Sequence, residues 1–462
     1  MNPGRLTRVK EKAIANQKQY VLYWMQQSQR VHYNHALNHA IVLANEKKLP
    51  VVVYFGLTPD YIGANRRHYQ FMLEGLKGVC NLLEKLGIAF VFRIESPEKG
   101  LINLLGDADV LVMDQGYLKH QIAWRNYVIN QANNHLPHLA IDVVETDVVV
   151  PVKIASQKSE YGAYTLRPKL NKLMKAYLDF EKLETVTVKN TLTFKSDDDL
   201  LHIDHLLDLL PIDQSVQPSP FFKGGYVHAS KCIHDFLAEK AHRYLKSNDP
   251  STQDTSMLSM YLHFGQISPL EIIAHLRLSL IQGHIEQKVY DAFIEQLFIR
   301  RELGFNFVTF QKGYDTFEKM TEAWAYQTMK AHEQDIRSHL YDLKQIESGQ
   351  THDSYFNAAM KEMVITGYMH NYMRMYWAKK IIEWSSSHQE AYQILVYLNN
   401  KYFIDGRDPN SYASIAWCFG KHDRPWTERP IFGKLRYLND KGLERKFNIK
   451  GYLQRIDDLT EN

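Results

Sequence analysis

The strongest constraint on the fold is a change of sequence pattern partway along the 462 residues. In the first third, short apolar segments alternate with segments of helical periodicity. The strand-like segments are 20–25, 51–56, 88–93, 110–114 and 139–144, and the helical ones are 33–47, 69–86 and 118–134. Such alternation is typical of a mostly parallel sheet with helices on both faces. We therefore expect a Rossmann-like α/β domain at the N-terminus.

From about Phe221 onward, strand-like segments nearly vanish and helical periodicity dominates. The helical segments are 228–244, 270–282, 288–307, 322–334, 354–366, 370–385 and 389–401. Between the two halves, residues 185–220 are polar, lack periodicity and end in Gln217-Pro218-Ser219-Pro220, which indicates a connection. We predict an α/β domain at 1–184, a linker at 185–220 and an all-helical domain at 221–462.

The segment after the first strand argues against a classical NAD site. It reads Trp24-Met25-Gln26-Gln27-Ser28, where a dinucleotide fold needs glycines that admit a pyrophosphate. The three cysteines are far apart and show no metal-ligand spacing, so we expect neither a metal site nor a disulfide framework. We expect a monomer in a reducing, cytoplasmic setting. No signal peptide and no membrane-spanning run is apparent.

Charge is informative only locally, because the net charge of +3 is too small to indicate a nucleic-acid binder. From Lys421 to Lys446, eight Lys/Arg stand against four Asp/Glu, and Trp426 and Tyr437 interleave with them. A solvated basic face and a strip that contacts phosphates both fit this pattern.

The stretch 398–417 is unusually rich in polar groups. It holds Asn399, Asp405 and Arg407 in one short span and then runs into an apolar helix that ends at Trp417. A polar surface loop is one interpretation. The other is the wall of a cavity in which a few polar groups orient a flat, largely apolar ligand.

Three further stretches carry candidate chemistry. Hydroxyls at 255, 256 and 259 precede an apolar helical turn, which suits either N-capping or phosphate oxygens. Arg301 and Glu302 suit ordinary ion pairs. On the apolar helix 369–384, Arg374 needs an anionic partner. Trp377 and Trp384 are seven residues apart on the same helix, which suits a core stripe or a redox relay.

Together these stretches resemble the photolyase/cryptochrome superfamily, and specifically the class II cyclobutane pyrimidine dimer photolyases. The resemblance depends on motifs spread in order over most of the chain. In the C-terminal half they are YLHFGQIS (261–268), RREL (300–303), RSHLYDL (337–343), MRMYWAKKIIEW (373–384), DGRDPNSYASIAW (405–417) and HDRPWTER (422–429). In the N-terminal half they are YWMQQSQR (23–30), QFMLEGL (70–76) and ASQKSEYGAYTLRPKL (155–170).

The resemblance implies light-driven DNA repair by a flavoprotein lyase. Excited, reduced FAD would donate an electron to a flipped-out pyrimidine dimer in UV-damaged DNA, the cyclobutane ring would split and the electron would return. The helical domain would hold FAD, and the α/β domain would be of the antenna type, with a deazaflavin, a folate or nothing as its second chromophore.

The resemblance also assigns residues. Catalytic roles would fall to Gln296, Asn399 (facing flavin N5), Trp377, Trp384, Tyr376 and Met375. The FAD-binding set would be Tyr244, Thr255, Ser256, Leu258, Ser259, Arg301, Arg374, Asn399, Asp405 and Arg407, with Arg374 pairing with Asp405. DNA and the dimer would contact Arg300, Trp417, Arg424, Trp426, Arg429 and Arg436.

Two departures from the class II pattern matter. Gln296 stands where the family usually has a Glu that hydrogen-bonds the dimer, which predicts weaker repair. Phe356 stands where the family typically has the middle Trp of a three-Trp relay, which predicts slow photoreduction, with Tyr341, Tyr355 or Tyr376 as substitutes. A cryptochrome-like photoreceptor with weak or no repair is therefore the alternative function. The repair enzyme is favoured because the DNA-facing residues match the family.

Overall fold

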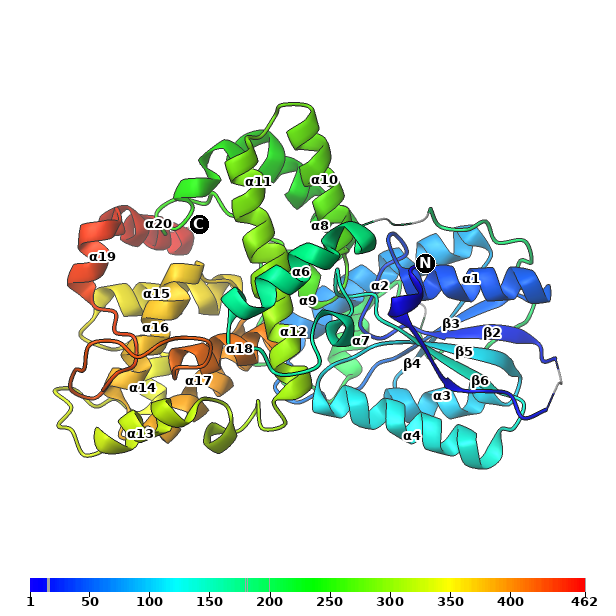
Figure 1. Cartoon of the computed structure of the whole chain (residues 1–462), viewed down its shortest axis with the longest axis horizontal. Helices are drawn as coiled ribbons and strands as arrows, with labels where there is room; N and C mark the ends of the chain where they lie inside the picture. The colour runs from blue at the N-terminus through cyan, green and yellow to red at the C-terminus, as the bar shows by residue number, and fades with distance from the viewer. Residues whose placement is uncertain (15–16, 179, 181, 199, 462) are drawn as a thin grey trace.

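The computed structural model describes residues 1–14, 17–178, 180, 182–198 and 200–461. Its N-terminal domain contains a six-stranded sheet in the order β1-β6-β5-β2-β3-β4 (Figure 1). The strands are β1 (Leu6–Lys10), β2 (Tyr20–Trp24), β3 (Val51–Gly56), β4 (Ala89–Arg93), β5 (Ala108–Asp114) and β6 (Ala140–Val144). All neighbouring pairs are parallel except β1 with β6. The predicted mostly parallel sheet is thus confirmed, and β1 is an antiparallel edge strand that the sequence analysis missed.

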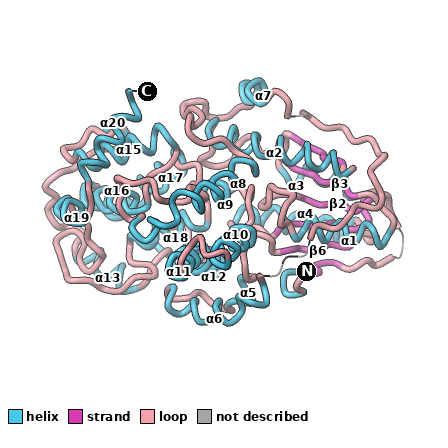
Figure 2. The backbone as a smooth tube through the Cα atoms, turned by 90° about the horizontal axis from the view of Figure 1, so that it is seen from above, coloured by secondary structure: helices cyan, strands magenta, loops and turns pink. Residues whose placement is uncertain are grey.

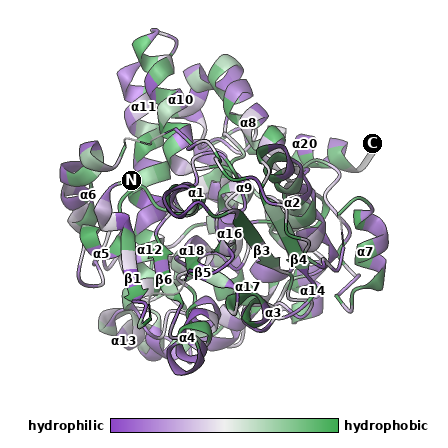
Figure 3. Cartoon of the chain, turned by 90° about the vertical axis from the view of Figure 1, so that its right-hand side faces the viewer, coloured by the Kyte–Doolittle hydropathy of each residue, from purple (hydrophilic) through white to green (hydrophobic). Residues whose placement is uncertain are grey.

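Helices cover both faces of this sheet because consecutive strand residues point to opposite sides. On one face, Val21 and Val53 pack with α1 (His35–Lys47) and α2 (Arg66–Leu86). On the other, Leu22 and Val52 pack with α3 (Pro97–Leu105) and α4 (Lys119–His135). Accordingly, β3 and β4 are among the most hydrophobic parts of the chain (Figure 3).

The predicted linker runs along the surface of the α/β domain. The Glu184 N–H donates to Asn38, the Asn190 N–H donates to the Gly87 carbonyl, and Asp197 pairs with Arg93. A short helix, α7 (Ile203–Leu209), interrupts the segment and lies beside α2 (Figure 2). The segment 184–217 is therefore anchored to the first domain before the chain enters the second.

Two helices inside the predicted range 1–184 pack with the second domain. They are α5 (Val152–Ala155) and α6 (Ala163–Tyr177). Leu166 and Leu170 of α6 share a hydrophobic cluster with Phe298, and Arg167 forms an ion pair with Glu295. These two helices therefore pack with the second domain and do not cover the sheet of the first.

Among its described residues, the second domain consists of helices joined by loops (Figures 1 and 2). Its longer helices are α8 (Tyr226–Asp235), α10 (Pro269–Ile281), α11 (Gln287–Ile294), α12 (Arg301–Phe310), α13 (Ala323–Ala331), α15 (Ser354–Thr366), α16 (Asn371–Trp384), α17 (His388–Tyr402), α18 (Pro409–Cys418) and α20 (Ile449–Glu461). Shorter ones are α9 (Ser259–His263), α14 (Leu343–Glu347) and α19 (Asp440–Lys446), besides the 3-10 turns η3 (Ala241–Lys246) and η5 (Phe317–Lys319). A further 3-10 turn, η1 (Pro3–Arg5), precedes β1 in the first domain.

Two helices predicted as continuous contain wider π turns. The segment 288–307 includes η4 (Glu295–Arg300), and the segment 228–244 includes η2 (Phe236–Lys240) before it tightens into a 3-10 turn. Hydrophobic periodicity does not reveal such turns, because one extra residue per turn changes the facing of later side chains without interrupting the helix. Gln296 and Arg300 are both exposed on the η4 turn.

Two buried arginines connect the domains. Arg30 donates to the carbonyls of Thr146 and Gly265, and Arg67 donates to the carbonyls of Gln217 and Tyr402. Each guanidinium thus satisfies backbone acceptors from both halves of the chain. A search of the described residues for a helix long and apolar enough to cross a membrane found none.

Candidate functional site

The centre of the site is the turn between α17 and α18. Asp408 caps α18 by accepting the Asn410 N–H at 2.8 Å, and Pro409 begins the helix. A side chain at Gly406 would lie 2.7 Å from the Asn399 carbonyl oxygen, so only glycine fits there. The turn is therefore pressed against the end of α17.

Arg374 of α16 reaches this turn. Its Nη2 lies 3.0 and 3.2 Å from the two carboxylate oxygens of Asp405, and its Nε donates to the Met369 carbonyl. The guanidinium also lies 3.8 Å from the centre of the Phe403 ring. Although most of α16 is buried, 25% of the Arg374 side chain stays accessible. The guanidinium is thus oriented by the Asp405 carboxylate, the Met369 carbonyl and the Phe403 ring.

A chain of three residues fixes the amides at the end of α17. The Arg407 N–H donates to Asn400 Oδ1 at 3.0 Å, and Asn399 Nδ2 donates to the same oxygen at 3.0 Å. Arg407 has φ +61°, a left-handed conformation that costs a residue with a side chain about 1–2 kcal/mol. Neighbouring contacts maintain this strained conformation at the site.

The residues predicted to hold the flavin phosphates lie just before and in α9. Thr255 and Ser256 are half-buried, Leu258 is buried and Ser259 is exposed. The Thr255 hydroxyl lies 3.2 Å from the Tyr368 hydroxyl. Tyr244, which the resemblance places in the FAD-binding set, is half-buried and packs on Phe236 and Phe293, and burial raises its pKa to about 12.

The helix η4–α12 separates two arginines that the sequence places side by side. Arg300 is exposed and pairs with Glu295. Gln296 is exposed on the same π turn. Arg301 is buried, with Nη2 3.2 Å from Asp147 and its guanidinium 4.6 Å from the Phe305 ring centre. Burial raises the pKa of Asp147 to about 7, although Arg301 opposes that shift. Arg301 thus connects the second domain to the loop after β6.

The predicted relay residues line a buried path through α15 and α16. Trp377 donates its Nε1–H to the sulfur of Met360 at 2.9 Å. Phe356 lies one helical turn before Met360, and its ring centre is 5.0 Å from that of Trp384. Phe356 therefore lies against Trp384, one helical turn from the residue that contacts Trp377. Tyr376 is also buried, and its hydroxyl donates to Asp353.

We call Trp417, Asp423, Arg424, Trp426, Arg429 and Arg436 the basic strip. Asp423 organises it by accepting from Arg436 at 3.0 Å and from the Trp426 indole at 3.3 Å. The Arg436 guanidinium lies 4.2 Å from the Trp426 ring centre and 4.9 Å from that of Trp417. Burial would raise the pKa of Asp423, but Arg436 holds it below its usual value. The strip thus presents stacked rings and guanidinium groups.

The remaining members of the strip extend outward. Arg424 lies over Trp426, and Arg429 lies over Tyr437 at 5.1 Å from the ring centre. Both arginines are exposed, whereas Trp417 is half-buried, as is Met375 on the neighbouring α16. The structure therefore gathers the predicted DNA-facing residues on one segment, apart from Arg300 on η4.

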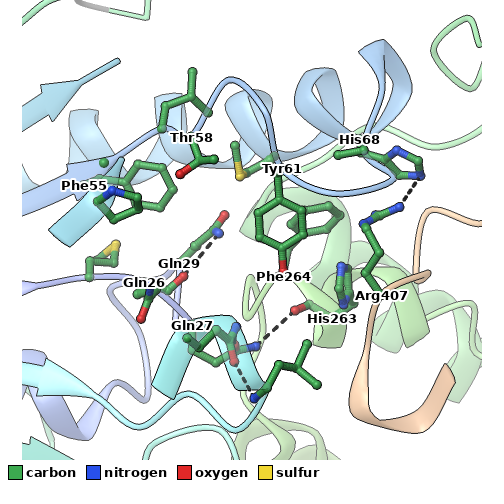
Figure 4. A pocket seen from close by; sticks show the side chains of 18 of the residues that line it. Gln26, Gln27, Gln29, Phe55, Thr58, Tyr61, His68, His263, Phe264 and Arg407 are labelled. Atoms are coloured by element: carbon green, nitrogen blue, oxygen red, sulfur yellow. Dashed lines mark hydrogen bonds between the residues drawn. The ribbon is translucent and has the colours of Figure 1, made fainter. Parts of the chain in front are cut away.

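A cavity that the sequence analysis missed opens at the carboxyl ends of β2 and β3 (Figure 4). We call it the second cavity, to distinguish it from the site around Arg374 and Asp405. It encloses about 860 Å³ of space free of protein atoms, part of it open to solvent. Its walls combine Trp24, Phe55 and Trp124 from the first domain with Phe264 and Arg407 from the second. Ligands of open α/β sheets bind at this end of the strands.

Unpaired polar atoms line this second cavity. Gln26 Nε2, Gln29 Oε1 and Thr58 Oγ1 are buried without a hydrogen-bond partner. Buried polar atoms normally have partners, so three orphans around one cavity indicate a ligand with complementary donors and acceptors. The sequence feature that could have predicted this cavity is the run of glutamines after the first strand, where a dinucleotide-binding fold would have glycines.

The fold and the site define a class of protein. The structure resembles a bacterial class III photolyase from Agrobacterium tumefaciens (TM-score 0.72, 17% identity, 96% of this chain and 87% of that chain) and a cryptochrome from Synechocystis (TM-score 0.73, 14% identity, 96% and 89%). These similarities show the fold of the photolyase/cryptochrome superfamily, with an α/β domain followed by a helical one.

The sequence comparisons narrow the class. The family model for DNA photolyase matches residues 21–188. A deoxyribodipyrimidine photo-lyase from Methanothermobacter thermautotrophicus is 44% identical (96% of this chain, 95% of the relative), and one from Arabidopsis thaliana is 37% identical (100% and 94%). The chain therefore belongs to the DNA photolyase family, and the family predicted from the motifs is confirmed. The class II assignment stays a prediction.

Proposed function

We propose that the protein is a deoxyribodipyrimidine photo-lyase that splits cyclobutane pyrimidine dimers in UV-damaged DNA with light. The observation that carries this proposal is the basic strip, in which Arg436 stacks on Trp426 and Trp417, in a chain of the DNA photolyase family. A photoreceptor without repair would not need the strip, so its retention favours the enzyme over the cryptochrome-like alternative.

The side chains around the Arg374–Asp405 pair fit FAD. The carboxylate suits ring N–H donors, the Asn399 amide suits the flavin edge, and the hydroxyls of Thr255 and Ser256 suit phosphate oxygens. When bound, reduced FAD supplies the electron that opens the cyclobutane ring. The protein holds and orients, and the cofactor carries the chemistry.

The basic strip would receive the DNA. Arg424 and Arg429 are free to contact backbone phosphates, and Trp426 with Arg436 would fill the gap left by a flipped dimer. A damaged, poorly stacked base pair is cheap to extrude, which favours the lesion over intact DNA. Gln296 would reach the dimer as a neutral donor and acceptor without a transferable carboxyl proton.

The second cavity would hold an antenna chromophore. Trp24, Phe55 and Trp124 offer apolar walls for a flat ring, and the three orphaned polar atoms suit its heteroatom edge. Arg407 is the only lysine or arginine along its described lining. A folate with several carboxylates would find few cations there, so a deazaflavin-type ring fits better than a folate.

The direct test is to irradiate the purified, reduced protein with an oligonucleotide that carries one thymine dimer. Recovery of base absorbance with light, and none in the dark, is the expected result. Light-independent binding of the oligonucleotide without recovery would transfer support to the photoreceptor. If the protein shows no binding of the oligonucleotide and no recovery of absorbance, both functions are refuted.

A further inference from the structure

Two residues of one short turn face two different sites. Asp405 pairs with Arg374 on the side proposed for the flavin. Arg407, two residues later, lines the second cavity beside His68 (Figure 4). The sequence suggested one role for both, as flavin ligands. The structure separates them, which makes the turn a shared wall between the two proposed binding sites.

The turn also fixes which atom Asn399 presents. A backbone N–H can only donate, so the Asn400 atom that contacts the Arg407 N–H at 3.0 Å is its oxygen. That oxygen can only accept, so Asn399 contributes its Nδ2 to the contact. The Asn399 Oδ1 is thereby left as the atom available to a bound ring, and it is an acceptor.

The Arg407 side chain has poor partners for a buried cation. Its Nη1 donates to the Asn400 carbonyl and lies 3.4 Å from the Gly63 carbonyl and 3.0 Å from His68 Nε2. His68 Nδ1 accepts the Asn65 N–H, so the ring proton lies on Nε2, which donates to Phe403. His68 Nε2 therefore carries a hydrogen and cannot accept one from Arg407.

No carboxylate pairs with Arg407 in the part of the chain that the structure describes. Burial lowers the pKa of Arg407 to about 10, and burial, then Arg407, holds the pKa of His68 well below its usual value. A buried guanidinium without a carboxylate is better satisfied by an anionic or carbonyl oxygen of a ligand. Glycine would fit its positive φ at less cost, which indicates that the side chain is kept for a function.

We propose that Arg407 is a positioning residue that couples the two sites. Its guanidinium binds an acceptor oxygen of a heteroaromatic ligand in the second cavity. Its backbone and its contact to the Asn400 carbonyl set the Asn400 amide, which sets Asn399 toward the flavin. Occupancy of the second cavity therefore changes the flavin environment. This inference rests on the proposed function of both sites.

The experiment uses the full chain loaded with FAD and compares three variants. Arg407→Gly removes the guanidinium and relieves the backbone. Asn400→Ala removes the oxygen that Asn399 and Arg407 share. Gln29→Ala, the control, removes a polar group of the second cavity that does not contact the turn. The measurements are the flavin absorption spectrum, its midpoint potential, the melting temperature, and titration with 8-hydroxy-5-deazaflavin or methenyltetrahydrofolate.

Each variant has a distinct expected result. Arg407→Gly weakens probe binding about tenfold and shifts the flavin spectrum and potential, while its melting temperature stays equal or rises. Asn400→Ala shifts the flavin spectrum without weakening the probe. Gln29→Ala weakens the probe without shifting the flavin. In the unaltered protein a bound probe shifts the flavin potential, and in Asn400→Ala it does not.

Several results would overturn the coupling. One is an Arg407→Gly spectrum and potential equal to those of the unaltered protein. Another is a probe-induced shift of equal size in Asn400→Ala. If neither probe binds the unaltered protein, the ligand part of the proposal is wrong. Failure to retain FAD or to repair the dimer refutes the proposed function itself, which is a different outcome.

Discussion

The basic strip and the buried path beneath it differ in how well they match their expected roles. In the strip, Arg436 and Trp426 are held by Asp423. In the path, the residue in contact with Trp384 is Phe356, where the family resemblance predicts a tryptophan. The strip is thus expected to bind DNA, while the predicted route for electrons lacks its middle tryptophan.

This difference separates two activities that a photolyase combines. Splitting a dimer needs a reduced flavin next to the substrate, and the electron returns after the ring opens. Reducing an oxidised flavin with light needs a route for electrons from the protein surface. A chain with an intact strip and an interrupted path is therefore expected to repair DNA once it is reduced, and to reduce itself slowly.

Removing the centre of the strip should have the largest effect. Arg436→Ala takes a guanidinium from two tryptophan rings and leaves the Asp423 carboxylate without its main partner. We expect affinity for a dimer-containing duplex to fall by about 10- to 100-fold, with photoreduction unchanged. Fluorescence anisotropy with a labelled duplex measures this. Arg429→Ala, farther out on the strip, is the matched control with a smaller loss. Equal losses in the two variants would show that Arg436 contributes only charge.

Restoring the path should have the next largest effect. Phe356→Trp places an oxidisable ring between Trp377 and Trp384, so photoreduction of the oxidised flavin should become several times faster. Because Phe356 is fully buried, the larger ring costs about 1–3 kcal/mol of stability. Absorbance during blue illumination measures the rate, and Phe356→Leu controls for repacking. Fast photoreduction in the unaltered protein would contradict the interruption.

Strong local patterns made the fold predictable. The boundaries of β3 and α15 agree with the predicted 51–56 and 354–366, because a continuous apolar run and a regular helical period each leave little choice. The edge strand β1 was missed because its residues Leu6–Lys10 are mostly exposed and show no apolar run. Hydrophobic patterns in the sequence identify elements that are buried. They fail for an exposed strand such as β1, which forms because it pairs with a neighbouring strand.

The site was less predictable because tertiary structure decides which way a side chain faces. The motif at 405–407 placed Asp405 and Arg407 together, yet Asp405 pairs with Arg374 while Arg407 lines the second cavity. The second cavity joins Gln29 to Arg407, which lie in different domains, so no spacing in the sequence could reveal it. Motif resemblance supplied the flavin set, whose individual roles remain predictions.

The glutamine on the π turn offers a smaller change that sharpens the same comparison. Gln296→Glu supplies a carboxyl group that can share a proton with the dimer, so the quantum yield of repair should rise modestly. Photoreduction and DNA affinity should not change, since Gln296 lies outside both the path and the strip. Dimer loss per absorbed photon, measured at saturating DNA, checks this. An unchanged yield would argue against a role for position 296.

The smallest expected effect concerns the residual photoreduction. Of the three tyrosines considered as substitutes, Tyr341 alone has a ring contact with Trp384, at 5.4 Å, and its hydroxyl donates to His352 Nδ1 at 2.7 Å. It can give an electron to oxidised Trp384 and its proton to His352. Tyr341→Phe should therefore slow the residual reduction, whereas Tyr355→Phe, whose hydroxyl binds Glu444, should not.

The pH dependence tests the same pair. Burial, and then His339, lowers the pKa of His352, so the imidazole is neutral and ready to accept the proton at neutral pH. Residual photoreduction should fall as the pH drops through that lowered pKa, because protonated His352 has no free nitrogen for the phenol proton. Tyr341→Phe should abolish this pH dependence. If the unaltered protein and Tyr341→Phe have the same pH profile, the electron that reduces the flavin does not come from Tyr341. It would then reach the flavin by a route that does not include the Tyr341–His352 pair.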